Sequence, residues 1–281
     1  MITFVKRLIL TAVAVPSFYA LCIVLDEYHH LALNIAIAVV MAGGVVEAAR
    51  LGRHSGEPVS TVVLPIAAST LVPVTYLELA GIVPAPVLAL WFTALVGSVL
   101  VATVVKAQRH GAEASFRQAA TWMLQLVYPG FLATYMVRMA WLPHAPLQYL
   151  LFFCLIFTND TSAYLAGRIA GPGTALGLAA SPAKTAVGFV TGFLMSIGFA
   201  VIFRLAAPHA FPGMGWMIGI GAMVGVTTIL GDLVESAMKR SAGVKDSGRL
   251  MFGRGGVLDS VDSMLLSAPV FVVLMRLAGR A

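Results

Sequence analysis

The sequence predicts an all-α, polytopic integral membrane protein, because of its composition, its long apolar runs and the distribution of its basic residues. Hydrophobic residues make up 59% of the 281-residue chain and charged residues only 11%, whereas a soluble domain is roughly 25% charged. The mean hydropathy is +0.93. A chain of this composition belongs in lipid, so its length indicates a number of membrane spans rather than a number of soluble domains.

Apolar runs long enough to cross a bilayer, about 20 residues each, occur along the whole chain. They are separated where Gly, Pro, His or charged residues cluster, as in DEYHH, RLGRHSGEP, GIVPAP and LPHAP. We interpret the first run as a retained helix rather than a signal peptide, because VPSFYALC is a poor small-residue cleavage site. About nine spans are predicted, at residues 4–25, 31–49, 59–79, 84–105, 117–137, 147–167, 184–206, 214–238 and 257–278.

The basic residues predict how these spans are oriented. With the N-terminus in the cytoplasm, most of the 18 Lys and Arg residues lie on or near the cytoplasmic side, as the positive-inside rule expects. The residues on the opposite side are Arg138, Arg204, Arg276 and Arg280. The net charge of +6 therefore indicates orientation and anionic head groups, not nucleic acid. We expect a bacterial inner-membrane protein whose charged C-terminal loops face the cytoplasm.

Two functional parts are expected: N-terminal helices over residues 1–145 and a motif-bearing part over residues 146–281. The second part contains GDLVESAMKRSAGVKDSGRLMFGRGGVLDSVDS. At about 100° per residue, Asp232, Glu235 and Lys239 share one helix face. Ionised side chains within a span cost several kcal/mol unless they are paired or hydrated, so this face indicates a cavity or a partner. The alternative is an ordinary helix end with an i,i+4 ion pair.

The end of this stretch has the features of a metal and phosphate site. Asp259 and Asp262 are spaced i,i+3, and a divalent cation such as Mg²⁺ would favour both carboxylates being charged. Gly253, Gly255 and Gly256 would let backbone N–H groups approach a phosphate beside a helix N-terminus. The alternative is that Asp259 caps the last span and that Asp262 interacts with its helix dipole.

A second polar island comprises FTNDTSAYLAGR and SPAKTAVG. Asp160 interrupts an apolar run, which favours a functional role over a stray charge. Ser181 can N-cap the following helix, and Lys184 and Thr185 would then lie near a helix N-terminus, where an anion is favoured. Ordinary capping is the alternative for these residues. Glu47 is interpreted as an interfacial carboxyl near a helix end, although it could line the same cavity.

These motifs together resemble a known family. SAMKRSAGVKDSG and GRGGVLDSVDS resemble the C-terminal signature of phosphatidate cytidylyltransferases, also called CDP-diacylglycerol synthases, and NDTSAYLAGR and SPAKT resemble two further elements of that family. The motifs cover residues 157–263. Ala183, Phe252, Arg254 and Ser260 stand where the family has Lys, Pro, His and Arg. Arg254 is expected to supply the positive charge that is lost at position 260, since Arg is a good phosphate ligand.

The resemblance implies a reaction in which phosphatidate attacks the α-phosphorus of CTP and yields CDP-diacylglycerol and pyrophosphate, with Mg²⁺ as cofactor and a second cation left open. It also implies a homodimer embedded in the membrane. The residues expected to act in catalysis are Lys239, Arg240, Lys245 and Asp246. The residues expected to hold metal are Asp232, Asp246, Asp259 and Asp262. The residues expected to bind substrate are Arg168, Ser181, Lys184, Thr185, Ser236, Arg254, Gly255 and Gly256.

Three alternatives from other classes stay open at this point. A CTP-dependent polyprenol or phytol kinase has related motifs, but it would release CDP rather than pyrophosphate. A non-catalytic relative could keep the site for binding lipid and nucleotide. A transporter would suit Gly- and Pro-broken spans with intramembrane charge, but the sequence has no paired halves.

Overall fold

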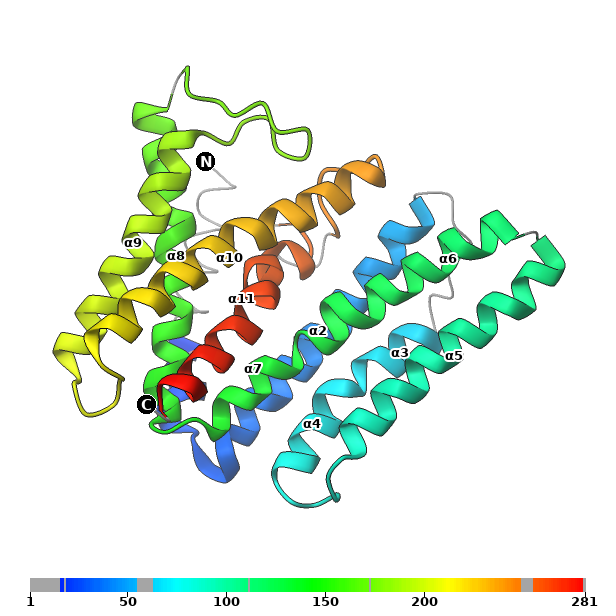
Figure 1. Cartoon of the computed structure of the whole chain (residues 1–281), viewed down its shortest axis with the longest axis horizontal. Coiled ribbons are helices and arrows are strands. Elements are labelled where there is room, and N and C mark those ends of the chain that lie inside the picture. Colours follow the sequence, from blue (N-terminus) through cyan, green and yellow to red (C-terminus); the bar gives the residue numbers. More distant parts are fainter. Residues whose placement is uncertain are drawn as a thin grey trace. The chain divides into compact units, whose positions relative to one another are not determined.

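The fold is helical throughout the part of the chain that the computed structural model describes, residues 16–17, 19–54, 63–110, 112–171, 173–248 and 255–279 (Figure 1). One isolated β-bridge joins Ala175 and Thr185. The all-α prediction is therefore confirmed. The helices are η1 (Ala20–Val24), α2 (Glu27–His54), α3 (Val63–Ser69), α4 (Leu71–Leu79), α5 (Val87–His110), α6 (Ala112–Gln125), η2 (Leu126–Phe131), α7 (Thr134–Arg138), η3 (Met139–Trp141), α8 (Ala145–Ala170), α9 (Ala186–Ala206), α10 (Met214–Ser241) and α11 (Leu258–Ala278).

Within these residues, six helices are long and apolar enough to cross a membrane: α2, α5, α8, α9, α10 and α11. Each coincides with a predicted span, so the protein is an integral membrane protein. The first predicted span, residues 4–25, falls largely on residues outside the described ones. The predicted count of about nine spans is not confirmed.

Two further predicted spans consist of shorter helical pieces, and prolines give the physical reason. In the span predicted at 59–79, α3 and α4 are separated at Thr70. Pro73 has no N–H for the carbonyl four residues earlier, so a continuous helix would lose a hydrogen bond there. In the span predicted at 117–137, the π-helix η2 contains Pro129, and a π-turn is a common way for a helix to accommodate such an interruption.

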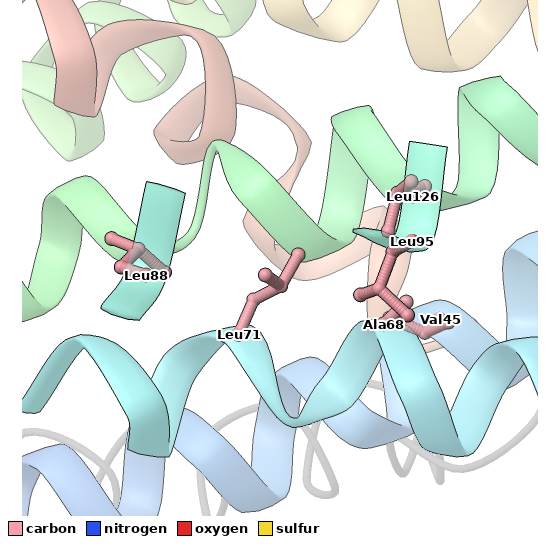
Figure 2. Close-up of a cluster of buried hydrophobic side chains, with 6 residues drawn as sticks. All are labelled: Val45, Ala68, Leu71, Leu88, Leu95 and Leu126. Carbon is pink, nitrogen blue, oxygen red and sulfur yellow. The ribbon is translucent and has the colours of Figure 1, made fainter. Parts of the chain in front are cut away.

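The chain packs into two compact units. Unit 1 comprises residues 1–138 and 238–261, and unit 2 comprises residues 139–237 and 262–281. The expected functional division at residue 145 stays a prediction. Helices α2, α3, α4 and α5 and the π-helix η2 supply a tightly packed apolar cluster to unit 1 (Figure 2). Its members are Val45, Ala68, Leu71, Leu88, Leu95 and Leu126.

In unit 2, α8 and α9 lie side by side (Figure 1), and polar and small residues join them to α10. Asn159 on α8 donates from Nδ2 to Ser196 Oγ at 2.9 Å and to the Gly225 carbonyl at 3.2 Å. Phe152 and Phe271 bring α8 and α11 together, with ring centroids 5.3 Å apart. Small residues and interhelical hydrogen bonds are typical of helix packing in lipid, where the hydrophobic effect contributes little to association.

The backbones of α10 and α11 approach each other closely within unit 2 at Gly231. A Cβ atom added there would lie 2.7 Å from the Asp262 carbonyl oxygen and 2.9 Å from Ser263 Cα. Both are backbone atoms, so only movement of a whole helix could relieve the clash. Glycine at 231 therefore lets α11 lie directly against α10, immediately before Asp232.

We expect Gly231→Ala to destabilise the protein by about 1–3 kcal/mol through overpacking. The measurement is thermal unfolding in detergent. Gly219→Ala on the same helix is the matched control, because no atom lies within 4 Å of a Cβ added there, and alanine is a better helix former than glycine. Equal melting temperatures for the two variants would contradict the close packing at Gly231.

Candidate functional site

A first group of polar residues from the predicted set lies in unit 1, at the start of α11. Gly255 has φ +100°, a conformation that strongly favours glycine, and a Cβ atom there would lie 2.5 Å from Asp259 Oδ2. The Gly256 N–H donates to the same carboxylate oxygen at 2.7 Å. The two glycines therefore let the turn fold back over the Asp259 carboxylate. Asp259 lies inside α11 and accepts from an N–H that precedes the helix, so it is not the N-cap that the alternative expected.

The Asp259 carboxylate has further partners. Its Oδ2 also accepts from the Ser247 N–H and from Ser247 Oγ, both at 2.9 Å. Its Oδ1 pairs with Lys239 Nζ at 2.6 Å, and the Asp259 and Lys239 side chains are only 7% and 15% exposed. Solvent screens so protected an ion pair weakly, and removing one partner would leave a buried charge without compensation. Lys239 is thereby fixed at the end of α10.

Glu47 is the residue whose position sequence reasoning missed. It is not interfacial but completely buried, and its Oε2 accepts from Ser247 Oγ at 3.0 Å and from the Leu258 N–H at 2.9 Å. The signal that could have found it is the GG pair four and three residues earlier on α2. A Cβ at Gly43 would meet a Val257 methyl group at 3.2 Å, so this face of α2 packs against the turn that precedes α11.

The second polar group lies in unit 2. Lys184 Nζ pairs with Asp232 Oδ2 at 2.6 Å, with side-chain exposures of 18% and 37%. Ser236, one helical turn further along α10, donates from Oγ to Asp232 Oδ1 at 3.2 Å. Lys184 Nζ also lies 5.4 Å from the centroid of the Phe189 ring. A lysine from the loop before α9 and an aspartate from α10 are thus held together at a half-exposed position.

The loop before α9 corrects one expectation. Ser181 does not cap the helix, because residues 181–184 form a turn closed by a hydrogen bond from the Lys184 N–H to the Ser181 carbonyl at 3.2 Å. The chain then becomes extended at Thr185, which forms the β-bridge with Ala175. Thr185 is the N-cap of α9, and its Oγ1 accepts from the Gly188 N–H at 3.1 Å.

The other predicted site residues are less closely engaged. Arg168 is exposed and donates from Nη1 to the Tyr164 hydroxyl at 3.2 Å. Asp262 is half-buried, and its Oδ1 accepts from the adjacent Ser263 N–H at 2.6 Å. Arg254 lies outside the described residues. The exposed members of the predicted set at the end of α10 and in the loop after it are Arg240, Lys245 and Asp246.

Oxygen ligands from carboxylates are what Mg²⁺ prefers, and the predicted metal ligands fall in both units: Asp246 and Asp259 in unit 1, Asp232 and Asp262 in unit 2. In the part of the chain that is described, no three His, Cys, Asp or Glu side chains are grouped so that they could hold a metal ion. Asp232 and Asp262 nevertheless belong to the helix segments that meet at Gly231. One or two carboxylates, completed by water and phosphate oxygens, suffice for Mg²⁺ in nucleotide sites.

Comparison with known proteins shows what this chain is similar to. The phosphatidate cytidylyltransferase of Bacillus subtilis is 36% identical over 155 residues, which are 55% of this chain and 57% of that protein. The phosphatidate cytidylyltransferase of Staphylococcus saprophyticus is 35% identical over 164 residues, 57% of this chain and 60% of that protein. These two matches thus span less than two thirds of the relatives' own length.

A longer match is found in Synechocystis. Its phosphatidate cytidylyltransferase is 29% identical over 303 aligned residues, which cover 96% of this chain and 97% of that protein. The model of the cytidylyltransferase family matches residues 5–278, which is nearly the whole chain. The protein therefore belongs to the cytidylyltransferase family.

Proposed function

We propose that this protein transfers a cytidylyl group from CTP to phosphatidate, giving CDP-diacylglycerol and pyrophosphate. The observation that carries the proposal is the Lys239–Asp259 pair: 2.6 Å apart, hardly exposed, and held by the glycine turn before α11. Both residues belong to the signature by which the chain resembles this family, and the relatives described above bear the name of this activity. The comparisons do not favour the kinase or the non-catalytic alternative.

The reaction requires the protein to position the two substrates and to offset their charge, and it requires no nucleophile from the protein. A phosphate oxygen of phosphatidate forms a bond to the α-phosphorus of CTP, the bond between that phosphorus and the bridging oxygen breaks, and pyrophosphate leaves. Both reactants are anions, so cations must offset their repulsion and hold them in line. Lys239 and Lys184 are held in place by ion pairs, and Arg240 and Lys245 offer exposed charge to the triphosphate.

Mg²⁺ is the proposed cofactor, and a second cation is left open. When bound, the ion would neutralise charge on the phosphates of CTP and on the leaving pyrophosphate. Asp232 and Asp262, on the segments that meet at Gly231, are the preferred ligands in this proposal. Asp246 is exposed and available to a nucleotide-bound ion. Asp259 is the least available, because its side chain is only 7% exposed and already accepts four hydrogen bonds.

The site is proposed to face the cytoplasm from a bacterial inner membrane, where CTP is available and phosphatidate stays in the bilayer. The excess of basic residues on the proposed cytoplasmic loops supports this orientation. Thr185, Ser181 and Arg168 would contact one of the two phosphate-bearing substrates. A homodimer is part of the same proposal, and it rests on the family resemblance alone.

The test is an assay with the purified full-length protein in detergent micelles, with phosphatidate, Mg²⁺ and CTP labelled at the α-phosphate. Cytidylyl transfer places the label in the lipid and releases one pyrophosphate per labelled lipid. A kinase would leave the label in CDP and release no pyrophosphate. Binding of CTP without either product would identify a non-catalytic relative, and the proposed activity would then be wrong.

A further inference from the structure

We infer that Glu47 is a positioning residue of the cytidylyl-transfer site, acting by fixing the two loop segments that hold Asp259 and Lys239. This inference rests on the proposed function. Glu47 comes from α2, far from the signature in sequence, yet its carboxylate accepts hydrogen bonds from both segments: from Ser247 Oγ at 3.0 Å and from the Leu258 N–H at 2.9 Å. One side chain therefore joins the loop after α10 to the first residue of α11.

The glycines around Glu47 show how closely the carboxylate is enclosed. A Cβ atom at Gly248 would lie 2.2 Å from Glu47 Oε1, and one at Gly256 would lie 2.3 Å from Glu47 Oε2. Neither position can therefore carry a side chain while Glu47 stays in place. At positions 248 and 256, a glycine is needed to leave room for the Glu47 carboxylate. This need explains the two glycines, and no approaching phosphate has to be invoked.

A purely structural contact would not require a carboxylate at this position. Glu47 is fully buried, and its Oε1 has no hydrogen-bond partner among the described residues. A buried polar atom without a partner is unfavourable, and an apolar side chain of similar volume would avoid that cost. The presence of a carboxylate therefore points to its hydrogen bonds to Ser247 and Leu258 as its purpose.

Ser247 transmits the effect of Glu47 to the ion pair. Its hydroxyl oxygen lies 3.0 Å from Glu47 Oε2 and 2.9 Å from Asp259 Oδ2, and a hydroxyl has one proton to donate. The two carboxylates therefore share a single donor, and losing one of them changes the hydrogen bonding of the other. Asp259 in turn holds Lys239 at 2.6 Å, so a change at Glu47 reaches the proposed catalytic lysine through three contacts.

The test compares Glu47→Met with Glu47→Gln in the full-length protein. Methionine keeps the shape and suits a buried site, but it removes the acceptor, so we expect a folded protein whose kcat falls by about 10- to 100-fold through misplacement of the site. Glutamine keeps an acceptor oxygen for Ser247 and Leu258 and should restore most of the rate. Amide hydrogen exchange should be faster at Leu258 in Glu47→Met than in the wild type, because that N–H loses its acceptor.

Glu78 provides a matched control, since its Oε2 accepts from the Leu88 N–H at 2.6 Å in the same unit. Glu78→Met should leave both kcat and exchange at Leu258 unchanged. Wild-type kcat and exchange in Glu47→Met would overturn the inference, whereas the proposed function would stand if the wild type makes CDP-lipid. If the wild type makes no CDP-lipid, the exchange measurement still decides whether Glu47 holds the turn, because it needs no substrate.

Discussion

Replacing Asp259 with asparagine is expected to lower turnover by about a hundredfold or more, the usual effect of removing a group that stabilises transition-state charge. An asparagine oxygen can still accept from the Gly256 N–H and so keep the turn before α11 in place. Its amide nitrogen, however, would face Lys239 Nζ, which lies 2.6 Å from Asp259 Oδ1 in the wild type. Two donors would then oppose each other, and Lys239 would no longer be fixed. The measurements are kcat and the melting temperature.

A double variant separates the structural share of this effect from the catalytic share. Removing one partner of a protected ion pair is strongly destabilising, whereas removing both can be nearly neutral. Asp259→Asn combined with Lys239→Gln should therefore recover stability but not activity. Asp26→Asn, which removes the same charge from an exposed residue outside the site, should leave both unchanged. Full activity in Asp259→Asn would mean that Asp259 only holds the turn before α11 in place.

Local sequence patterns predicted which helix face carries a polar side chain, but not which distant residue that side chain contacts. Asp232 and Ser236, one helical turn apart on α10, are joined by a hydrogen bond at 3.2 Å. Periodicity gives the face on which a side chain lies, and it does not tell which distant segment packs there. Lys184 therefore could not be paired with Asp232 from spacing alone, and Glu47 could not be placed against Leu258.

Prolines and glycines limited the fold prediction in a similar way. Hydropathy treats proline as one more residue in an apolar run. The hydropathy of residues 117–137 therefore predicted a continuous span and gave no sign of the π-helix at Pro129. A glycine-rich turn near a helix N-terminus suits a phosphate, but it suits a carboxylate equally well. Gly255 and Gly256 show the second use, since added Cβ atoms would collide with Asp259 and with Glu47. Only the three-dimensional structure shows whether the glycines of such a turn leave room for a phosphate or for a carboxylate.

The Lys184–Asp232 pair allows the sharpest distinction between a structural and a functional ion pair. Asp232 is 37% exposed, and an ion pair this accessible contributes only about 0–1 kcal/mol to stability. Lys184→Met should therefore barely change the melting temperature. The same variant should lower kcat/KM by about 10²–10³-fold if the ammonium stabilises charge on a reacting phosphate.

Exchanging the two charges tests whether the orientation of the pair matters. The variant Lys184→Asp with Asp232→Lys keeps an ion pair between the α9 loop and α10, so it should fold with nearly wild-type stability. It also places a carboxylate where we expect a phosphate and a lysine where we expect Mg²⁺, and two anions in contact repel each other. We therefore expect no restoration of kcat/KM relative to Lys184→Met. Wild-type kcat/KM in the exchanged variant would instead mean that this ion pair only joins the α9 loop to α10. Other cations would then bind the phosphates.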